Sequence, residues 1–229
     1  FPQRRRVFLL GTLVKACLDL VYPPKCPGCG KAVAEHGQWC PLCLGPVLSL
    51  KALSPALHRL KHLAGCFIVC QYSGAVRHLL QDIKFHGEDN KQAALAWLLT
   101  QAAGTVRFAG IDAVVPVPLH PKRRRERGYN QTELLFSSWS RKQGFLWLPD
   151  VLLRERETLP QWELPSNERR KNIRGAFRVQ KSNLIQGKRI LLVDDIFTTG
   201  ATMDECAKTL LAVGAEKVEG LALASSSRG

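Results

Sequence analysis

The chain has 229 residues, 45% of them hydrophobic, which is enough for one full core and a small accessory unit. Its 33 Lys and Arg outnumber 19 Asp and Glu, and the formal charge of +14 favours anionic partners such as nucleotides, pyrophosphate, nucleic acid or an anionic membrane surface. No apolar run is long enough to span a bilayer. The eight cysteines, which include two C-x-x-C pairs, fit a metal site in a reducing, cytoplasmic compartment better than a secreted disulfide scaffold.

The first segment, residues 1–22, is predicted to form an amphipathic helix, because Val7, Val14 and Leu18 fall on one helical face. Lys15 interrupts the apolar run and no small-residue cleavage site follows, so the segment does not match a secretory signal peptide. A targeting role, or a role at a membrane surface, is the alternative interpretation of this helix.

The next segment, residues 23–50, is predicted to be a small zinc-binding unit. It contains the run CPGCGKAVAEHGQWCPLC, in which two C-x-x-C pairs are ten residues apart. The candidate ligands are Cys26, Cys29, Cys40 and Cys43. Four thiolates can surround Zn²⁺ tetrahedrally, and such a closed set leaves no open position for catalysis, so the expected role is structural. Redox-active pairs or an iron–sulfur centre are the alternatives.

The remainder, residues 51–229, is predicted to be an α/β domain with a mostly parallel sheet flanked by helices, because strand and helix patterns alternate. The strands are expected at residues 66–72, 111–119, 150–155, 189–195 and 217–225, and the helices at 75–86, 90–103, 130–143 and 201–213. Residues 46–65 are expected to be a connector. Residues 155–178 are charged and interrupted by prolines, and are expected to form a long mobile loop.

One strand of this domain, 189–195, ends in two adjacent acids, Asp194 and Asp195, and a loop of threonines and a glycine follows it. Ligands of parallel α/β sheets bind beyond the carboxyl ends of the strands. The loop and the helix that begins after it can hold a phosphate, because backbone N–H groups, hydroxyls and a helix N-terminus meet there. The acids can accept hydrogen bonds from sugar hydroxyls. The pattern therefore predicts a site for a ribose 5-phosphate.

The stretch ILLVDDIFTTGAT, residues 190–202, resembles the phosphoribosyl pyrophosphate (PRPP) motif of type I phosphoribosyltransferases. The resemblance implies that fold, with a hood over the site at about residues 155–178. In that family the acids contact the ribose hydroxyls and the threonine loop holds the 5-phosphate. These roles carry over to Asp194, Asp195, Thr198, Thr199, Gly200, Ala201 and Thr202.

Most of the chain after about residue 20 resembles the ComF-type competence family, which includes GntX-like proteins. The matching stretches occur in the same order, and they are YPPKCPGCG, YSGAVRHLLQDIKFHG, VVPVPLHPKRRRERGYNQ, RRKNIRGAF and VDDIFTTGAT. The resemblance implies a zinc finger followed by a phosphoribosyltransferase domain. It also implies a role in the uptake of transforming DNA, with a helicase-like partner at the inner face of the membrane.

The basic stretch PLHPKRRRERGYNQ resembles by position the loop that receives pyrophosphate in these transferases. Arginine grips a polyanion with two parallel hydrogen bonds. The candidates for PRPP binding here are Arg124, Arg127, Gly128, Tyr129 and Asn130, with Asn130 also placed to cap the next helix. A solvated basic loop is the alternative. Lys84, at the end of a predicted helix, is either a phosphate contact or a partner of the helix dipole.

The hood, residues 155–178, is expected to act as a lid that excludes water. Its arginines, with two from the basic stretch, are candidates for contacts to pyrophosphate or nucleic acid, and they are Arg123, Arg125, Arg169, Arg170 and Arg174. A mobile, charged surface segment is the alternative.

Two main hypotheses follow. In the first, the chain is an enzyme that binds PRPP with Mg²⁺ and transfers its ribosyl group to an unidentified acceptor, with Asp194, Asp195 and Arg127 at the reacting centre. In the second, it is a non-catalytic module that senses PRPP or a nucleotide and binds single-stranded DNA. A zinc-stabilised interaction protein with an inactive site is a third possibility.

Overall fold

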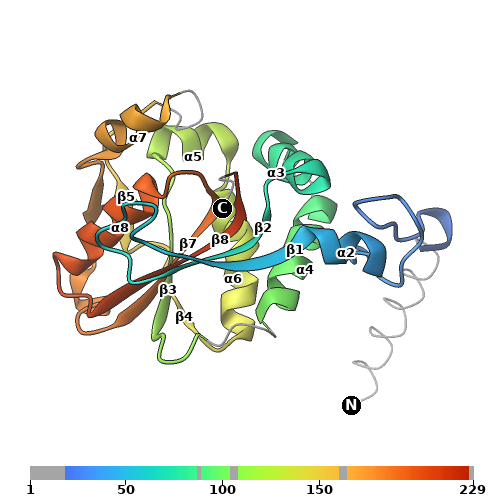
Figure 1. Cartoon of the computed structure of the whole chain (residues 1–229), viewed down its shortest axis with the longest axis horizontal. Helices are drawn as coiled ribbons and strands as arrows, with labels where there is room; N and C mark the ends of the chain where they lie inside the picture. The colour runs from blue at the N-terminus through green and yellow to red at the C-terminus, as the bar shows by residue number, and fades with distance from the viewer. Residues whose placement is uncertain (1–18, 87–88, 104–107, 160–163, 227–229) are drawn as a thin grey trace, which may run out of the picture.

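Six strands form one mostly parallel sheet through the centre of the molecule (Figure 1). The computed structural model describes residues 19–86, 89–103, 108–159 and 164–226. In spatial order the strands are β1 (Leu48–Leu53), β2 (Cys66–Gln71), β8 (Lys217–Ser225), β7 (Arg189–Phe197), β3 (Ala113–Pro116) and β4 (Leu146–Trp147). β1 and β2 pair antiparallel, and each of the other neighbouring pairs is parallel. The sheet confirms the predicted α/β fold class.

Helices cover both faces of the sheet, which explains why its central strands are apolar throughout. Residues 190–193 of β7 are fully buried although alternate side chains point to opposite faces. One hydrophobic cluster contains the apolar side of α8 (Ala201–Leu211). The other contains buried residues of α3 (Gly74–His86), α4 (Asp89–Ala103) and α6 (Gln131–Lys142). The two clusters lie on opposite sides of the sheet (Figure 1).

The hood contains regular structure where the sequence predicted a long loop. The hood contains α7 (Ser166–Ile173) and β6 (Phe177–Val179), and β5 (Leu152–Arg154) lies directly before it in the chain. β5 and β6 form an antiparallel pair. Ile173 and Ala176 are fully buried in the cluster that α8 joins, and the N–H of Gly175 donates to Glu205 Oε1 of α8 at 2.9 Å. A few apolar anchors therefore order a stretch that is otherwise charged.

Two further elements lie where the sequence predicted connecting segments. α5 (Pro121–Arg127) forms in the basic stretch after β3, because the His120 ring accepts the N–H of Lys122 at 3.3 Å and Gly128, with φ of 81°, ends the helix. β1 lies in the predicted connector and joins the main sheet as its edge strand. It begins inside the predicted zinc-binding unit and ends outside it.

The cysteine-containing segment lies at one end of the molecule beside α2 (Pro41–Val47) (Figure 1). The predicted helix over residues 1–22 falls outside the described residues except at its end, where residues 19–21 are helical. Within the described ranges, no helix is long and apolar enough to cross a membrane.

Candidate functional site

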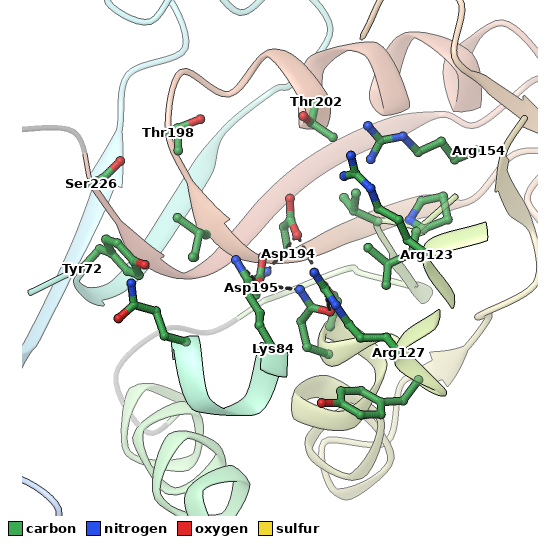
Figure 2. Close-up of a pocket in the computed structure, with 18 of the residues that line it drawn as sticks. Tyr72, Lys84, Arg123, Arg127, Arg154, Asp194, Asp195, Thr198, Thr202 and Ser226 are labelled. Carbon is green, nitrogen blue, oxygen red and sulfur yellow. Dashed lines mark hydrogen bonds and ion pairs between the residues drawn. The ribbon is translucent and has the colours of Figure 1, made fainter. Parts of the chain in front are cut away.

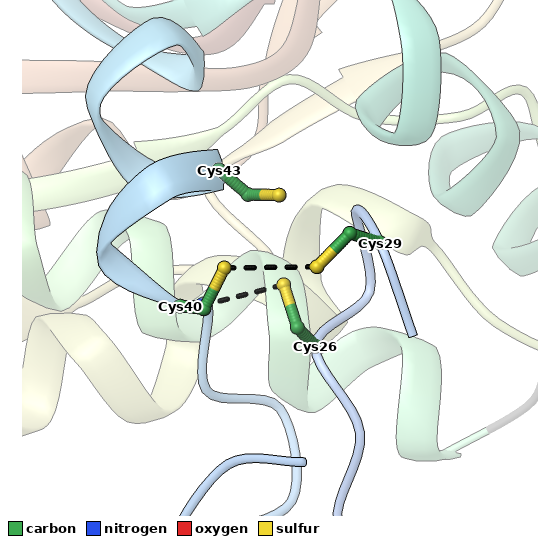
Figure 3. A group of neighbouring side chains, drawn as sticks. All are labelled: Cys26, Cys29, Cys40 and Cys43. Carbon is green, nitrogen blue, oxygen red and sulfur yellow. Dashed lines mark hydrogen bonds between the residues drawn. The ribbon is translucent and has the colours of Figure 1, made fainter. Parts of the chain in front are cut away.

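The four predicted zinc ligands lie together (Figure 3). The sulfurs of Cys26, Cys29, Cys40 and Cys43 all lie within 4.8 Å of one another. The Sγ atoms of Cys29 and Cys40 are 3.7 Å apart, which matches the edge of about 3.8 Å for a tetrahedron with Zn–S bonds of about 2.3 Å. At Gly28 an added Cβ would lie 2.9 Å from the sulfur of Cys43, so the turn needs glycine. The donor set and its geometry fit a structural zinc ion.

The zinc unit is fastened to the main domain by Trp39, which the sequence analysis did not single out. Its side chain is 1% exposed, and its indole N–H donates to the carbonyl of Ala94 in α4 at 3.0 Å. Gly37 packs beside it, since an added Cβ there would lie 2.8 Å from the backbone of Ala93. The metal unit is therefore docked against α4.

A cavity of about 890 Å³ opens at the carboxyl ends of β3, β7 and β8 (Figure 2). Asp194, Asp195, Thr198 and Thr202 line it, together with residues from α3, α5, α6 and β5. The cavity thus lies at the edge of the sheet where parallel α/β folds bind their ligands.

The aspartate pair forms the floor of this cavity and is held by the first turn of α6. Gln131 Nε2 donates to Asp195 Oδ2 at 3.2 Å, and Lys84 Nζ lies 3.4 Å from the same oxygen. Asp194 Oδ1 accepts the hydroxyl of Thr132 at 3.3 Å and the backbone N–H of Asp195 at 2.9 Å. Gln131 and Thr132 are site residues that the sequence analysis missed.

The two acids differ in charge. Burial and the neighbouring Asp195 raise the pKa of Asp194 well above its ordinary value. Burial acts on Asp195 in the same direction, but Lys84 and the hydrogen bond from Gln131 outweigh it and hold the pKa of Asp195 below its ordinary value. As pH falls, Asp194 is therefore the member that takes up a proton first, while Asp195 stays ionised, and this proton reduces the repulsion between them. A protonated Asp194 can both donate to and accept from a sugar hydroxyl.

The threonine loop, residues 198–202, leads from β7 into α8. Gly200 is the N-cap of α8 with φ of 74°, and an added Cβ there would lie 2.7 Å from the ring of Phe197 and 2.8 Å from Leu60. Thr199 Oγ1 accepts the N–H of Ala201 at 3.4 Å. The free N–H groups of the helix start, with the cavity-facing hydroxyls of the loop, make an anion-binding surface.

Two guanidinium groups form one end of the cavity, which we call the arginine end: Arg123 of α5 and Arg154 of β5 (Figure 2). Both bond to Thr158 of the hood, Arg123 to its carbonyl at 3.1 Å and Arg154 to its hydroxyl. Arg154 is 7% exposed and its Nε has no hydrogen-bond partner within the described residues. Burial and the nearby Arg123 lower the pKa of Arg154. An anion placed here would relieve that repulsion.

Other predicted residues of the basic stretch lie beside the cavity. Arg127 lines it and donates to Gln131 Oε1 at 2.7 Å, which connects it through Gln131 to Asp195. Tyr129 also lines it, and its hydroxyl donates to the carbonyl of Ile83. Arg169 of α7 is a lining residue whose Nε donates to the carbonyl of Leu164 at 3.0 Å.

Several predicted residues have structural partners instead of lining the cavity. The guanidinium of Arg124 forms two hydrogen bonds to Glu133, at 2.9 and 3.0 Å. Arg170 lies 3.7 Å from Asp204 and donates to a backbone carbonyl of the segment before β2. The side chain of Asn130 caps α6, as predicted. Gly128, Arg125 and Arg174 are likewise absent from the cavity wall in the part of the chain described.

Comparisons with known proteins agree with this architecture. Residues 17–52 match the double zinc ribbon domain, and residues 129–228 match the phosphoribosyl transferase domain. The DNA utilization protein YhgH of Salmonella typhimurium is 32% identical over 85% of this chain and 87% of its own length. Competence protein F of Haemophilus influenzae is 31% identical over 86% of this chain and 82% of its own. Competence protein ComFC of Streptococcus pneumoniae is 30% identical over 86% of each.

Proposed function

The chain belongs to the ComF family of competence proteins, and on that premise we propose that it binds PRPP in the cavity and acts in the uptake or handling of DNA. The single observation that carries PRPP binding is the arrangement of one cavity. An aspartate pair, Thr198 and Thr202 of the threonine loop, and two guanidiniums without a carboxylate partner among the described residues all line it.

Each part of PRPP has a complementary partner in this arrangement. The loop 198–202 holds the 5-phosphate, and Asp194 and Asp195 take the ribose hydroxyls. The arginine end, with Arg127, takes the pyrophosphate. Mg²⁺ prefers oxygen ligands, and the pyrophosphate and ribose oxygens supply them, so the ion would arrive with the ligand and neutralise the leaving group.

The reaction that this geometry supports is transfer of the ribosyl group. The bond between C1 and the pyrophosphate oxygen breaks, and its electron pair leaves with pyrophosphate. A lone pair of the acceptor forms the new bond to C1, and the acceptor releases a proton. The arginines stabilise the charge that develops on pyrophosphate, and the hood excludes water from the cationic centre.

A titration of PRPP in the presence of Mg²⁺, followed by calorimetry, tests this proposal. We expect binding by the intact protein and at least a tenfold loss in Asp195→Asn, because a charged acceptor of hydrogen bonds and the partner of Lys84 are both removed. Glu35→Gln, an exposed acid on the zinc unit, is the matched control and should bind normally. Equal PRPP affinity in the two variants would refute the assigned site.

Binding of single-stranded DNA is the second candidate function, and the position of α5 favours it. This helix carries the run PKRRRER, and Lys122 and Arg123 connect it to the hood at Glu157 and Thr158. The two elements together present a basic surface beside the cavity mouth. Fluorescent single strands should bind at low salt and dissociate as salt rises.

We also propose that the protein handles DNA in the cytoplasm. A helicase-like protein is the further partner that we propose for it.

A further inference from the structure

Two parts of the cavity are suited to bind anions, and they belong to different elements. The threonine loop, residues 198–202, leads into α8, whereas the arginine end is formed by Arg123 of α5 and Arg154 of β5 (Figure 2). The hood contacts both parts, because Thr158 binds the two arginines and α7 packs against α8. The hood therefore connects the two anion-binding parts of the cavity.

Asp204 forms the connection at the threonine loop. Its N–H donates to the carbonyl of Gly200 at 2.8 Å, which closes the first turn of α8. Its carboxylate is buried, and one oxygen accepts the N–H groups of Lys61 and His62, both at 2.8 Å. The other oxygen lies 3.7 Å from the guanidinium of Arg170 in α7. Asp204 is therefore held in a fixed orientation between the threonine loop and the hood.

Asn172, two residues after Arg170 in α7, forms the connection toward the arginine end. Its carboxamide accepts the N–H of Leu159 at 3.2 Å and donates to the carbonyl of the same residue at 2.9 Å. Arg156 donates to the backbone carbonyl of Asn172 at 2.7 Å. Leu159 follows Thr158, whose carbonyl and hydroxyl accept the guanidiniums of the arginine end. A continuous series of polar contacts thus runs from the threonine loop to the arginine end.

The position of the hood depends on these polar contacts, because its apolar anchors are few. In the described part of the chain, its buried apolar residues are Ile173, Ala176 and Phe177. A ligand that binds at one end of the series orders the hood and bears the entropy cost of that ordering, so a second ligand at the other end bears less of it. Repulsion between two bound anions acts in the opposite direction, and Mg²⁺ on pyrophosphate reduces this repulsion.

We propose that Asp204 and Asn172 are positioning residues that couple the two anion-binding parts of the cavity, so that a phosphate at the threonine loop strengthens pyrophosphate binding at the arginine end. This inference rests on the proposed PRPP site and adds a way in which the hood regulates it. Neither side chain is among the described residues that line the cavity, so each acts through its contacts to others. Coupling between two sites is reciprocal, so pyrophosphate strengthens the binding of a sugar phosphate by the same factor.

Calorimetric titration of pyrophosphate with Mg²⁺, with and without saturating ribose 5-phosphate, measures this coupling without requiring catalysis. We expect ribose 5-phosphate to strengthen pyrophosphate binding by about fivefold or more, the lower end of typical coupling between two sites. The double variant Arg156→Gln/Asn172→Ala removes the side-chain contacts of α7 to residues 156–159. It should lower the coupling factor to about one or below, because charge repulsion remains. The affinity for each ligand measured alone should stay within about threefold.

Amide hydrogen exchange gives a second readout, which a purely structural role of Asp204 would not change. Ribose 5-phosphate alone should slow exchange in α7 of the parent protein, because ordering of the threonine loop reaches the hood. Asp204→Asn keeps the shape of the side chain and an oxygen for the two N–H groups, but removes the charge that faces Arg170. In this variant α7 should exchange equally fast with and without ribose 5-phosphate, and retained protection would count against the role of Asp204.

Arg178→Gln/Asn183→Ala is the matched control for the double variant. It removes the same two types of side chain, from an exposed arginine of β6 and an exposed asparagine beyond the hood, and it should keep the coupling factor of the parent. A parent protein in which ribose 5-phosphate does not strengthen pyrophosphate binding would overturn the inference. So would a factor that persists in Arg156→Gln/Asn172→Ala. If neither ligand binds alone, the proposed function fails and the inference fails with it, and the single titrations show this case separately.

Discussion

At the scale of single residues, the two members of the aspartate pair are expected to affect the free energy of unfolding at neutral pH in opposite directions. The pKa of Asp194 is raised by burial and by Asp195, so its carboxyl holds a proton in the folded chain at pH values where the unfolded chain has lost it. Its contribution to stability is therefore greatest below the unfolded pKa of about 3.9 and falls as pH rises through the raised folded pKa. We predict that Asp194→Asn raises the Tm of the ligand-free protein at pH 7. In a chain of this size, each kcal/mol added to the free energy of unfolding raises the Tm by about 2–4 °C.

Asp195→Asn is the paired test and should lower the Tm at pH 7. The pKa of Asp195 is lowered by Lys84 and Gln131 against the effect of burial, so its contribution is present above the unfolded pKa and is lost as pH falls through the folded pKa. The substitution also leaves Lys84 without its carboxylate. Thermal unfolding at pH 7 compares the two substitutions, and a series of measurements down to about pH 3 follows the loss of the Asp195 contribution. Equal destabilisation by the two variants at pH 7 would contradict the assigned charges.

Arg154 provides a second prediction at this scale. Because its buried guanidinium lies beside that of Arg123 at the arginine end, Arg154→Gln should weaken pyrophosphate and PRPP binding by about 10- to 100-fold, the value of one or two charged hydrogen bonds. Binding of ribose 5-phosphate should stay unchanged. Competition titrations measure all three affinities. Parallel losses for PRPP and ribose 5-phosphate would show that Arg154 supports the fold and not the pyrophosphate.

The sequence predicted the residues of one local motif and also Lys84 of a distant helix, but it missed Gln131 and Thr132. Asp194 and Asp195 stand in a run whose strand, loop and helix are contiguous. Gln131 and Thr132 act on them from positions 64 and 62 residues away, and only the packing of α6 beneath β7 shows this. Arg154 follows apolar residues, so its sequence context predicts a strand. Nothing in that context indicates that its guanidinium is buried in a cavity wall.

At the scale of elements, the zinc unit and the cavity should be separable. Among the residues that the structure describes, none of those lining the cavity comes from the zinc ribbon, which is docked on α4 through Trp39. We predict that Cys29→Ser loses the bound zinc and lowers the Tm, while PRPP affinity changes less than about threefold, because structural zinc contributes to folding and not to this cavity. Metal analysis, thermal unfolding and calorimetry check the three parts.

Cys206→Ser is the control for loss of a thiol, since Cys206 is buried in α8 and far from the cysteine cluster; it should keep zinc. A large loss of PRPP affinity that accompanies zinc removal would show that the zinc unit supports the site.

The elements that the sequence missed are the short ones. The strands near residues 66–72, 189–195 and 217–225 and the helices that flank them were predicted, because each carries a long apolar pattern. α5, α7 and β1 are short or charged, and contacts outside their own segments stabilise them. α7, for example, is held to α8 by Ile173 and by the ion pair of Arg170 with Asp204. Such contacts leave no periodic signal in the sequence.

At the scale of the whole molecule, the charge of +14 does not decide between a general attraction for polyanions and a defined binding face. The structure places exposed basic residues both beside the hood and far from it. Arg125 is exposed on α5, whose neighbours Lys122 and Arg123 contact the hood. Arg141 is exposed in the last turn of α6, a helix whose first turn lies at the cavity. Arg125 therefore lies near the end of the sheet that carries the cavity, and Arg141 lies toward the opposite end.

This separation makes a prediction for single-stranded DNA. Arg125→Gln and Arg141→Gln lower the net charge equally, so a response to total charge would be the same in both. If α5 and the hood form the binding face, only Arg125→Gln removes a phosphate contact. The slope of log K against log salt concentration should then become shallower by about 0.7 in Arg125→Gln and stay unchanged in Arg141→Gln. Equal slopes in the two variants and the parent would contradict a defined face. PRPP affinity should be normal in both variants, because neither side chain lines the cavity.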